Sequence, residues 1–166
     1  MDSLTKEARS QLMSRVRGRG NKSTELVLVH CLRRGHLHGW RRHVQMLGTP
    51  DFVFRKGRLC VFVDGCFWHG CPKCYRPPKS QKRFWSEKVQ RNRKRDKRIT
   101  RELTKVGWRV LRIRECQLKT NPDRCLKRIG AALTAGLERI RRTPTTVMRE
   151  LLLHPKSKPL RQPRKP

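Results

Sequence analysis

The sequence predicts a single α/β domain, and three segments indicate this class. The apolar run 59–63 is typical of a strand that is buried on both faces, as in the centre of an α/β sheet. Residues 81–106 predict a long helix, and residues 108–114 alternate as a strand does. A length of 166 residues is usual for one domain.

The N-terminal part predicts a basic segment followed by a helix. Residues 5–17 are interpreted as a short basic helix or arm, and residues 18–21 as a break. Apolar residues recur at helical spacing over 24–34, and Gly35 is a typical helix end. Residues 39–46 are predicted to be extended.

A β-hairpin is predicted next. Asp51 begins a strand over 51–54, after a turn that contains Pro50. A tight turn at Lys56 and Gly57 then leads to a second strand over 58–64.

The C-terminal part predicts two helices around a strand. The long helix carries one seam with alternating four- and three-residue spacing, apolar at both ends and polar in the middle: Trp85, Val89, Asn92, Asp96, Ile99, Leu103 and Val106. The strand 108–114 is expected to turn Trp108, Val110 (or Leu111) and Ile113 inward. A last amphipathic helix over 122–141 has the apolar positions Leu126, Ile129, Leu133, Leu137 and Ile140.

The chain is expected to have three parts, all of them basic. These are an N-terminal arm (1–20), a folded domain (21–142) and a mostly disordered tail (143–166). The net charge is +31, of which the tail supplies only +5. So large a charge opposes compaction unless a polyanion is bound, which makes nucleic acid the first candidate partner. A basic membrane-surface helix is the second candidate, but no strong amphipathic Trp/Leu stripe supports it.

The sequence favours an intracellular location. No run of about 18 apolar residues predicts a membrane span. The polar first ten residues do not match a secretory signal. We therefore expect a cytoplasmic protein whose seven cysteines are metal ligands or core residues.

Three cysteines form a candidate zinc site. Cys66, Cys71 and Cys74 have the spacing C-x4-C-x2-C in a loop rich in Gly and Pro. The best fourth ligand is Cys116, just after the strand 108–114, and His69 is the local competitor. Reduced thiols without metal are the alternative. The remaining three cysteines lie in apolar patterns and predict core packing: Cys31, Cys60 and Cys125.

Acidic residues are few, which makes their positions informative. Asp51 and Asp64 lie at the ends of neighbouring strands, where two carboxylates could share Mg²⁺. Ordinary turn and strand-end use is the alternative. His69 follows in the next loop and could accept a proton from an attacking water, although a lone loop histidine is more often solvated. Glu25 begins a helix, where the helix dipole favours an acid in any case.

Two adjacent aromatics, Phe67 and Trp68, lie between Asp64 and His69. In a DNA-binding protein such residues can wedge between base steps. Packing over the metal site is the alternative. Met13 in the basic arm is a weaker candidate for the same role.

Together these segments resemble the very-short-patch repair DNA mismatch endonucleases. The resemblance covers about residues 8–140 and rests on five motifs: SRVRGRGNKSTE (14–25), LGTPDFVF (47–54), VFVDGCFWHGCPKC (61–74), FWSEKVQRNRKRD (84–96) and GWRVLRIREC (107–116). It implies a restriction-endonuclease-like three-layer α/β/α fold with a central mixed sheet. It also implies Mg²⁺-dependent nicking 5′ to the thymine of a T:G mismatch, which arises when 5-methylcytosine deaminates.

The resemblance implies a role for each site residue. Asp51 and the main-chain carbonyl of Val63 would bind Mg²⁺, with His69 activating the water and Glu25 near the metal waters. Phe67 and Trp68 would insert beside the mismatch, with Met13 opposite. A structural zinc would be bound by Cys66, Cys71, Cys74 and Cys116. Phosphate contacts are expected from the basic long helix, at Lys88, Arg91, Arg93, Lys94 and Arg95.

The sequence departs from the best-known enterobacterial pattern at two places. Val63 and Asp64 replace Thr and His, so Asp64 becomes a candidate direct Mg²⁺ ligand. The zinc set is four cysteines rather than a mixture of His and Cys. In addition, the lysine of orthodox restriction enzymes falls at Cys66, so its role must be taken elsewhere, with His69 the nearest group.

Two rival functions stay open at this point. One is a non-catalytic zinc-dependent DNA-binding module, and the other is a restriction-type nuclease that cuts fully paired DNA. The expected partner is duplex DNA with a T:G mismatch. The chain is expected to be a monomer and not to bind membranes. The resemblance adds mismatch-repair proteins and a cytosine methyltransferase as partners.

Overall fold

The computed structural model describes residues 24–78 and 81–142. The predicted arm with Met13 and the predicted tail lie outside these residues. The described helices and strands follow in the order α2 (Glu25–Arg34), β1 (Trp40–Arg41), β2 (Phe52–Phe54), β3 (Leu59–Asp64), α3 (Lys82–Lys105), β4 (Arg109–Arg114), α4 (Glu115–Thr120) and α5 (Pro122–Arg142).

The strands form one mixed sheet in the order β1-β2-β3-β4. β1 pairs with β2, and β2 with β3, in antiparallel fashion, which confirms the predicted hairpin. β3 pairs with β4 in parallel, because the long helix α3 carries the chain back across the sheet between them. β3 is therefore an inner strand. The loop that follows its carboxyl end, residues 65–74, is called the site loop below.

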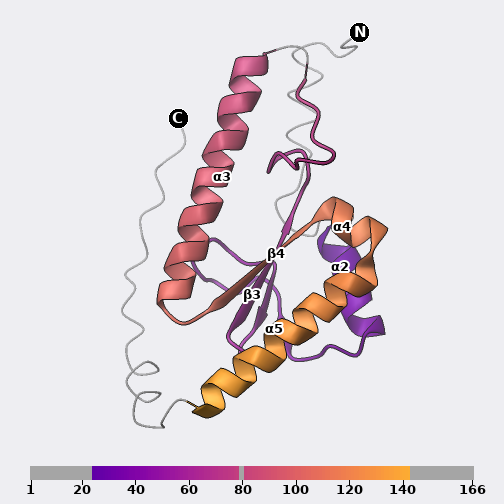
Figure 1. Cartoon of the computed structure of the whole chain (residues 1–166), viewed down its shortest axis with the longest axis vertical. Helices are drawn as coiled ribbons and strands as arrows, with labels where there is room; N and C mark the ends of the chain where they lie inside the picture. Colours follow the sequence, from indigo (N-terminus) through magenta and orange to yellow (C-terminus); the bar gives the residue numbers. More distant parts are fainter. Residues whose placement is uncertain (1–23, 79–80, 143–166) are drawn as a thin grey trace.

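Helices cover both faces of this sheet (Figure 1). On one face, Leu59 and Val61 of β3 pack in a core with residues of α2 and α5. On the other face, Cys60 and Phe62 pack against Ile99 and Leu103 of α3. The predicted burial of β3 on both faces is thus confirmed, and so is the α/β class.

The seam on α3 is largely confirmed. Its buried members are Trp85, Val89, Asp96, Ile99 and Leu103. Val106 is an exception: it follows the helix as the C-cap and is 58% exposed.

Other packing predictions were wrong in detail. The inward set predicted for β4 is divided, because alternate residues of a strand face opposite sides of a sheet. Ile113 and Leu111 pack on the α5 side, and Trp108 and Val110 on the α3 side. On α5, Leu137 is exposed, because that helix extends beyond the core that covers Ile129.

Local elements differ from the predictions as well. Of the apolar residues that predicted α2, Leu26 is exposed and Leu32 is buried, together with Leu28 and Cys31. Only Trp40–Arg41 of the predicted extended segment pair as a strand, and the short helix α4 was not predicted. Within the described residues, no helix is long and apolar enough to cross a membrane.

Helix α5 approaches the β2–β3 turn very closely. A Cβ atom added at Gly136 would lie 2.2 Å from the carbonyl oxygen of Gly57. Real side chains do not tolerate so short a contact, so a glycine at position 136 permits this packing.

Candidate active site and thiolate cluster

The parallel pairing of β3 and β4 assembles the site. Asp64 at the end of β3 lies opposite Arg114 at the end of β4, so both carboxyl ends meet at one edge of the sheet. Cys66 and Cys116 each follow two residues later. The register therefore explains why thiols 50 residues apart in the sequence come together.

Four thiols converge at this edge. The Sγ atoms of Cys66, Cys71, Cys74 and Cys116 all lie within 4.8 Å of one another. The Sγ atoms of Cys71 and Cys116 are 3.6 Å apart, and the N–H of Cys116 donates to Sγ of Cys66 at 3.3 Å. Tetrahedral zinc with bonds of about 2.3 Å requires sulfur atoms about 3.8 Å apart. The donor set therefore fits zinc, and Cys116, not His69, joins the three loop cysteines.

Neighbouring groups favour the thiolate form of Cys71. Burial alone would raise the pKa of this thiol, but hydrogen bonds from the Arg114 side chain and from the N–H groups of Cys74 and Lys73 lower its pKa to about 5. A thiol that is ionised near neutral pH is ready to bind a metal. The other three cysteines are buried, as predicted for core residues: Cys31, Cys60 and Cys125.

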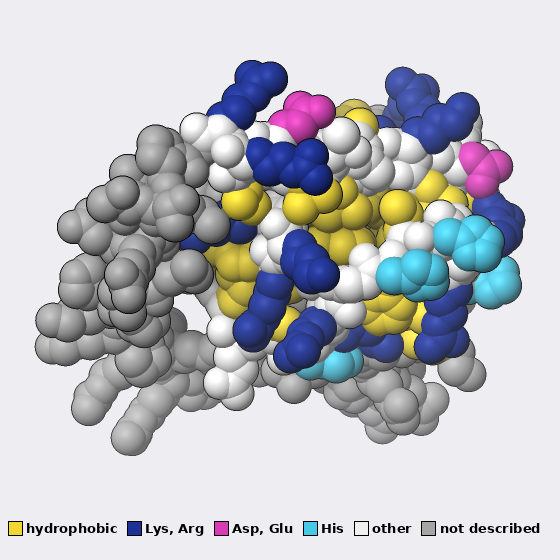
Figure 2. Space-filling model, turned by 90° about the horizontal axis from the view of Figure 1, so that it is seen from below, with side chains coloured by type: hydrophobic (Ala, Val, Ile, Leu, Met, Phe, Trp, Pro, Cys, Tyr) yellow, Lys and Arg dark blue, Asp and Glu magenta, His cyan; other side chains and the backbone are white. Residues whose placement is uncertain are grey.

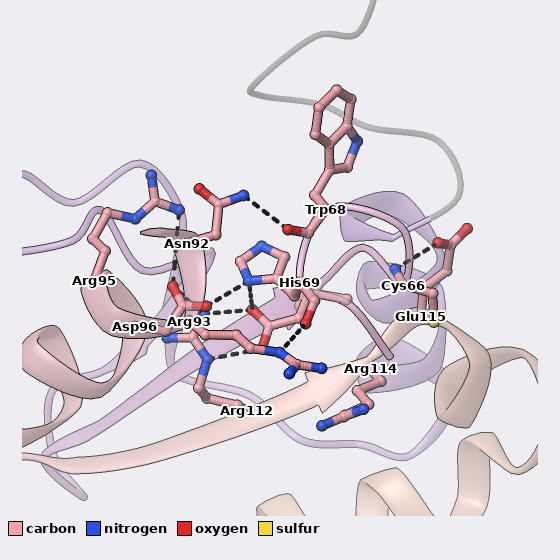
Figure 3. Close-up of polar contacts among 12 residues, drawn as sticks. Cys66, Trp68, His69, Asn92, Arg93, Arg95, Asp96, Arg112, Arg114 and Glu115 are labelled. Atoms are coloured by element: carbon pink, nitrogen blue, oxygen red, sulfur yellow. Dashed lines mark hydrogen bonds and ion pairs between the residues drawn. The ribbon is translucent and has the colours of Figure 1, made fainter. Parts of the chain in front are cut away.

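A second cluster joins one histidine to two acids (Figure 3). His69 Nδ1 lies 2.5 Å from Oδ2 of Asp96 and 3.7 Å from Oδ1 of Asp64. Arg112 donates to both oxygens of Asp64, from Nε at 2.8 Å and from Nη2 at 2.6 Å. The same Nη2 lies 3.0 Å from Oδ1 of Asp96. One guanidinium thus bridges both acids that flank the imidazole.

Strand alternation and the crossing of α3 explain this cluster. Arg112 lies opposite Phe62 in the parallel register, and its guanidinium carbon lies 4.7 Å from the centre of that ring. Phe62 and Asp64 are two residues apart and so point to the same face, which α3 covers. Asp96 reaches the cluster from α3 itself.

Asp51 lies just before β2, beside this cluster. Its Oδ2 accepts the N–H of Val63 at 2.7 Å. The pKa of Asp51 is raised to about 6: burial is the main cause, and the negative charges of Glu25 and Asp64 add to it, while the Val63 hydrogen bond and the Arg112 charge act in the opposite direction. A carboxylate held among like charges is a suitable ligand for a cation.

Glu25 is buried at the start of α2, with Arg42 at 2.5 Å from its Oε2. The negative charge of Glu25 raises the pKa of Asp51, so these two predicted site residues are neighbours. Neither belongs to a compact set of three potential ligands in the described residues: the two such sets are the four thiols and Asp64 with His69 and Asp96.

The loop with Phe67 and Trp68 packs on the start of α3. The Phe67 ring contacts Trp68, Tyr75 and Trp85 at centroid distances of 5.1 to 5.7 Å. Both aromatics are half-buried. The Phe67 ring thus lies against Trp85 of α3, and insertion of Phe67 and Trp68 into DNA stays a prediction.

Side chains of α3 fix the backbone of that loop. Asn92 Nδ2 donates to the carbonyl of Trp68 at 2.8 Å. Arg93 donates to the carbonyls of His69 and Gly70. The indole of Trp68 points away from the His69 cluster, as Figure 3 shows. Hydrogen bonds from α3 to backbone carbonyls thus hold the loop in place.

Most of the basic residues predicted on α3 are exposed. Arg91, Arg93, Lys94 and Arg95 are exposed and Lys88 is half-buried. Arg95 also lies 3.8 Å from Asp96, at the edge of the cluster. Figure 2 views the molecule from below relative to Figure 1. On this face, Lys and Arg side chains are spread widely and few acidic side chains lie among them.

Sequence reasoning missed two members of the cluster, Asp96 and Arg112. Asp96 had a signal, because Asn92 and Asp96 are the polar positions of an otherwise apolar seam, one helical turn apart. Both turn out to contact the site loop. Arg112 gave no such signal, because arginines alternate with apolar residues along β4.

The chain is similar to known DNA endonucleases. The model of the family described as DNA mismatch endonuclease Vsr matches residues 1–76. A type II nicking enzyme of Xanthomonas oryzae is 40% identical over 122 residues, 70% of this chain and 86% of that protein. A type II nicking enzyme of Neisseria meningitidis is 35% identical over 80% of this chain and 90% of its own length. The DNA mismatch endonuclease Vsr of Escherichia coli is 41% identical over 55% of this chain and 56% of its own length. The chain belongs to the family of very-short-patch repair DNA mismatch endonucleases and is a nuclease.

Proposed function

We propose that this nuclease is a Mg²⁺-dependent endonuclease that nicks duplex DNA 5′ to the thymine of a T:G mismatch. The names of its relatives include both mismatch endonuclease and nicking enzymes, which supports single-strand cleavage. The observation that carries the proposal is the position of Asp51. This half-buried carboxylate, with its pKa raised to about 6, lies beside the Asp64 that flanks His69.

The donor set suits Mg²⁺, which prefers carboxylate and carbonyl oxygens and keeps several waters. Asp51 would be the principal ligand, because the Val63 N–H fixes its orientation. The carbonyl of Val63 is the proposed second ligand, and Glu25 would orient waters nearby. When bound, the ion neutralises charge on the scissile phosphate and lowers the pKa of a water.

His69 is the proposed general base. Because its Nδ1 bonds to Asp96, the imidazole is held with Nε2 as the nitrogen that accepts the proton of the attacking water. Asp96 is then a positioning residue, which fixes the tautomer and orientation of the ring. The assignment of the proton to Nδ1 follows from this bond, since a carboxylate accepts and does not donate.

Mismatch selectivity is proposed to come from the loop aromatics. Phe67 and Trp68, with Met13 from the arm, would insert between base steps. Unstacking costs less at a mismatch, so insertion favours the T:G site. The hydrogen bonds from Asn92 and Arg93 to the loop backbone suit this role, because they hold the loop while its side chains move.

The thiolate cluster is proposed to bind structural zinc and to fix this loop beside β4. We also propose that the mixed sheet between its helices is a restriction-endonuclease-like fold. Phosphate contacts from the α3 residues Lys88, Arg91, Arg93, Lys94 and Arg95 would set the register of the DNA. Metal analysis of the purified chain is expected to find about one zinc per chain; its absence would contradict the four-cysteine site.

The test is nicking of labelled T:G and T:A duplexes with Mg²⁺ by the wild type and by Asp51→Ala. We expect one nick, confined to T:G, and none from the variant. Cleavage of both strands of the T:A duplex would instead support a restriction-type nuclease. Unchanged function of Asp51→Ala would support a DNA-binding module with no catalytic metal at Asp51.

A further inference from the structure

The cluster around Asp64 already holds a cation that belongs to the protein. Arg112 engages both oxygens of Asp64 in a bidentate pair and also reaches Asp96. Stacking on the Phe62 ring fixes the plane of the guanidinium. Such a pair is strong and directional, unlike a single contact between exposed charges.

The ligand geometry at this point would otherwise suit a metal. Asp64, His69 and Asp96 offer two carboxylates and an imidazole whose donor atoms lie within 4.8 Å of one another. All three side chains are largely buried, which strengthens their attraction for a cation. The guanidinium of Arg112 contacts the two carboxylates that such an ion would bind.

The charges around the cluster are balanced without a metal. Asp64 and Asp96 carry two negative charges, and Arg112 and Arg95 carry two positive charges within 4.0 Å of them. A divalent ion added here would leave an excess of positive charge at a half-buried site. Asp51 differs from these two acids: its carboxylate accepts the N–H of Val63, and among the described contacts it forms no ion pair with Lys or Arg.

We propose that Arg112 is a built-in cation that occupies the Asp64–His69–Asp96 cluster, keeps divalent metal ions out of it and confines Mg²⁺ to Asp51. The inference rests on the proposed magnesium site. In this proposal Asp64 is the ion-pair partner of Arg112, and not the direct metal ligand that the sequence suggested. Arg112 is a positioning residue, which supplies a fixed positive charge to the two acids beside His69.

Counting bound Mn²⁺ tests the proposal, because Mn²⁺ prefers the same oxygen ligands as Mg²⁺ and its free form is measured directly by electron paramagnetic resonance. The full-length, zinc-loaded protein is titrated without DNA. The wild type is expected to bind one ion per chain at its tighter site. Asp64→Asn is expected to keep that ion with less than about threefold change in Kd, because Asp64 is already neutralised.

Arg112→Met is expected to create a second Mn²⁺ site. Methionine keeps the length and packs on Phe62, but it leaves both carboxylates uncompensated. The double variant Arg112→Met/Asp64→Asn should return to one ion, and Arg112→Lys, which keeps the charge, should not gain a site. A single ion in a folded Arg112→Met protein would overturn the proposal.

The Asp64→Asn titration decides the question even where Arg112→Met does not fold. A loss of Mn²⁺ affinity of more than about tenfold would show that Asp64 is a direct ligand and overturn the role of Arg112. Asp51→Asn separates the two claims. Retention of the ion by Asp51→Asn, with Asp64→Asn also unaffected, would contradict the proposed magnesium site but not the exclusion of metal by Arg112.

Discussion

At the scale of single residues, the environment of Asp51 has a measurable consequence. Its pKa is raised to about 6, first by burial and then by the charges of Glu25 and Asp64. A carboxyl whose pKa is higher in the folded than in the unfolded state destabilises the fold when it ionises. This penalty is absent below the unfolded pKa of about 4 and is complete above about 6.

Asp51→Asn should therefore stabilise the metal-free protein at high pH only. We expect the free energy of unfolding to rise by about 2–3 kcal/mol at pH 8 and to change little at pH 4. Urea unfolding in Mg²⁺-free buffer, without a chelator that would strip zinc, measures the difference. Asp123→Asn, an exposed acid, is the control and should change little at either pH. An equal effect of Asp51→Asn at both pH values would refute the assigned cause.

Asp96 is expected to act through His69. Asp96→Asn removes the negative charge that orients the imidazole, so nicking of the T:G duplex should slow by about 100-fold. DNA affinity should change by less than about twofold, because the Asp96 side chain is largely buried and, of the exposed basic residues predicted to contact phosphates, only Arg95 pairs with it. Glu102→Gln on the same helix is the matched control, since Glu102 pairs only with exposed Arg101 and Lys105 among the described contacts. Equal rates for Asp96→Asn and Glu102→Gln would remove Asp96 from the mechanism.

The sequence predicted the chemistry of these residues better than their partners. Cys116 could be predicted as the fourth thiol because it follows a strand that, if parallel to 58–64, ends at the same edge. The Arg112 pair could not be predicted in the same way. It depends on the face of β4 that meets α3, which the alternation along 108–114 leaves undetermined.

At the scale of elements, long periodic patterns gave reliable predictions and short segments did not. The seam predicted α3 to within one residue at each end, because repeated apolar contacts define a long helix. β1 has only two residues and α4 six, and their formation depends on pairing with β2 and on the end of β4. Such elements are determined by tertiary contacts that local propensity does not contain.

Two glycines on α5 provide a matched test of its packing. Gly136→Ala places a methyl group against the Gly57 carbonyl and should lower the free energy of unfolding by about 1–3 kcal/mol. Gly130→Ala meets no atom within 4 Å and should raise it by about 0.5–1 kcal/mol through helix propensity. Urea unfolding of both variants measures the two signs. A stabilising Gly136→Ala would contradict the close approach of α5 to the β2–β3 turn.

At the scale of the whole molecule, charge is the dominant feature. Residues 1–142 carry +26 of the total +31, so most of the positive charge available to attract DNA lies outside the predicted tail. Four of the twelve acids lie in the site or beside it: Glu25, Asp64 and Asp96 are buried, and Asp51 is half-buried. A basic surface around an acidic centre suits a nuclease that binds both a polyanion and a cation.

DNA affinity should fall steeply with salt. For several phosphate contacts we expect a loss of about 10³-fold or more between 50 and 200 mM salt. Arg91→Gln and Lys94→Gln should each lower the slope of log Kd against log salt by about one. Arg33→Gln on α2, which covers the opposite face of the sheet, is the control and should leave the slope unchanged. If the wild type and all three variants had equal salt slopes, DNA would bind elsewhere than on α3.

The most direct test of the central claim is strand-specific nicking at a mismatch. Duplexes that differ only in T:G against T:A are labelled on each strand in turn and incubated with Mg²⁺ and either the wild type or Asp51→Asn. We expect one nick 5′ to the mismatched thymine, no cut in the T:A duplex, and bound but uncut DNA with Asp51→Asn. Equal cutting of both duplexes, or full activity of Asp51→Asn, would contradict it.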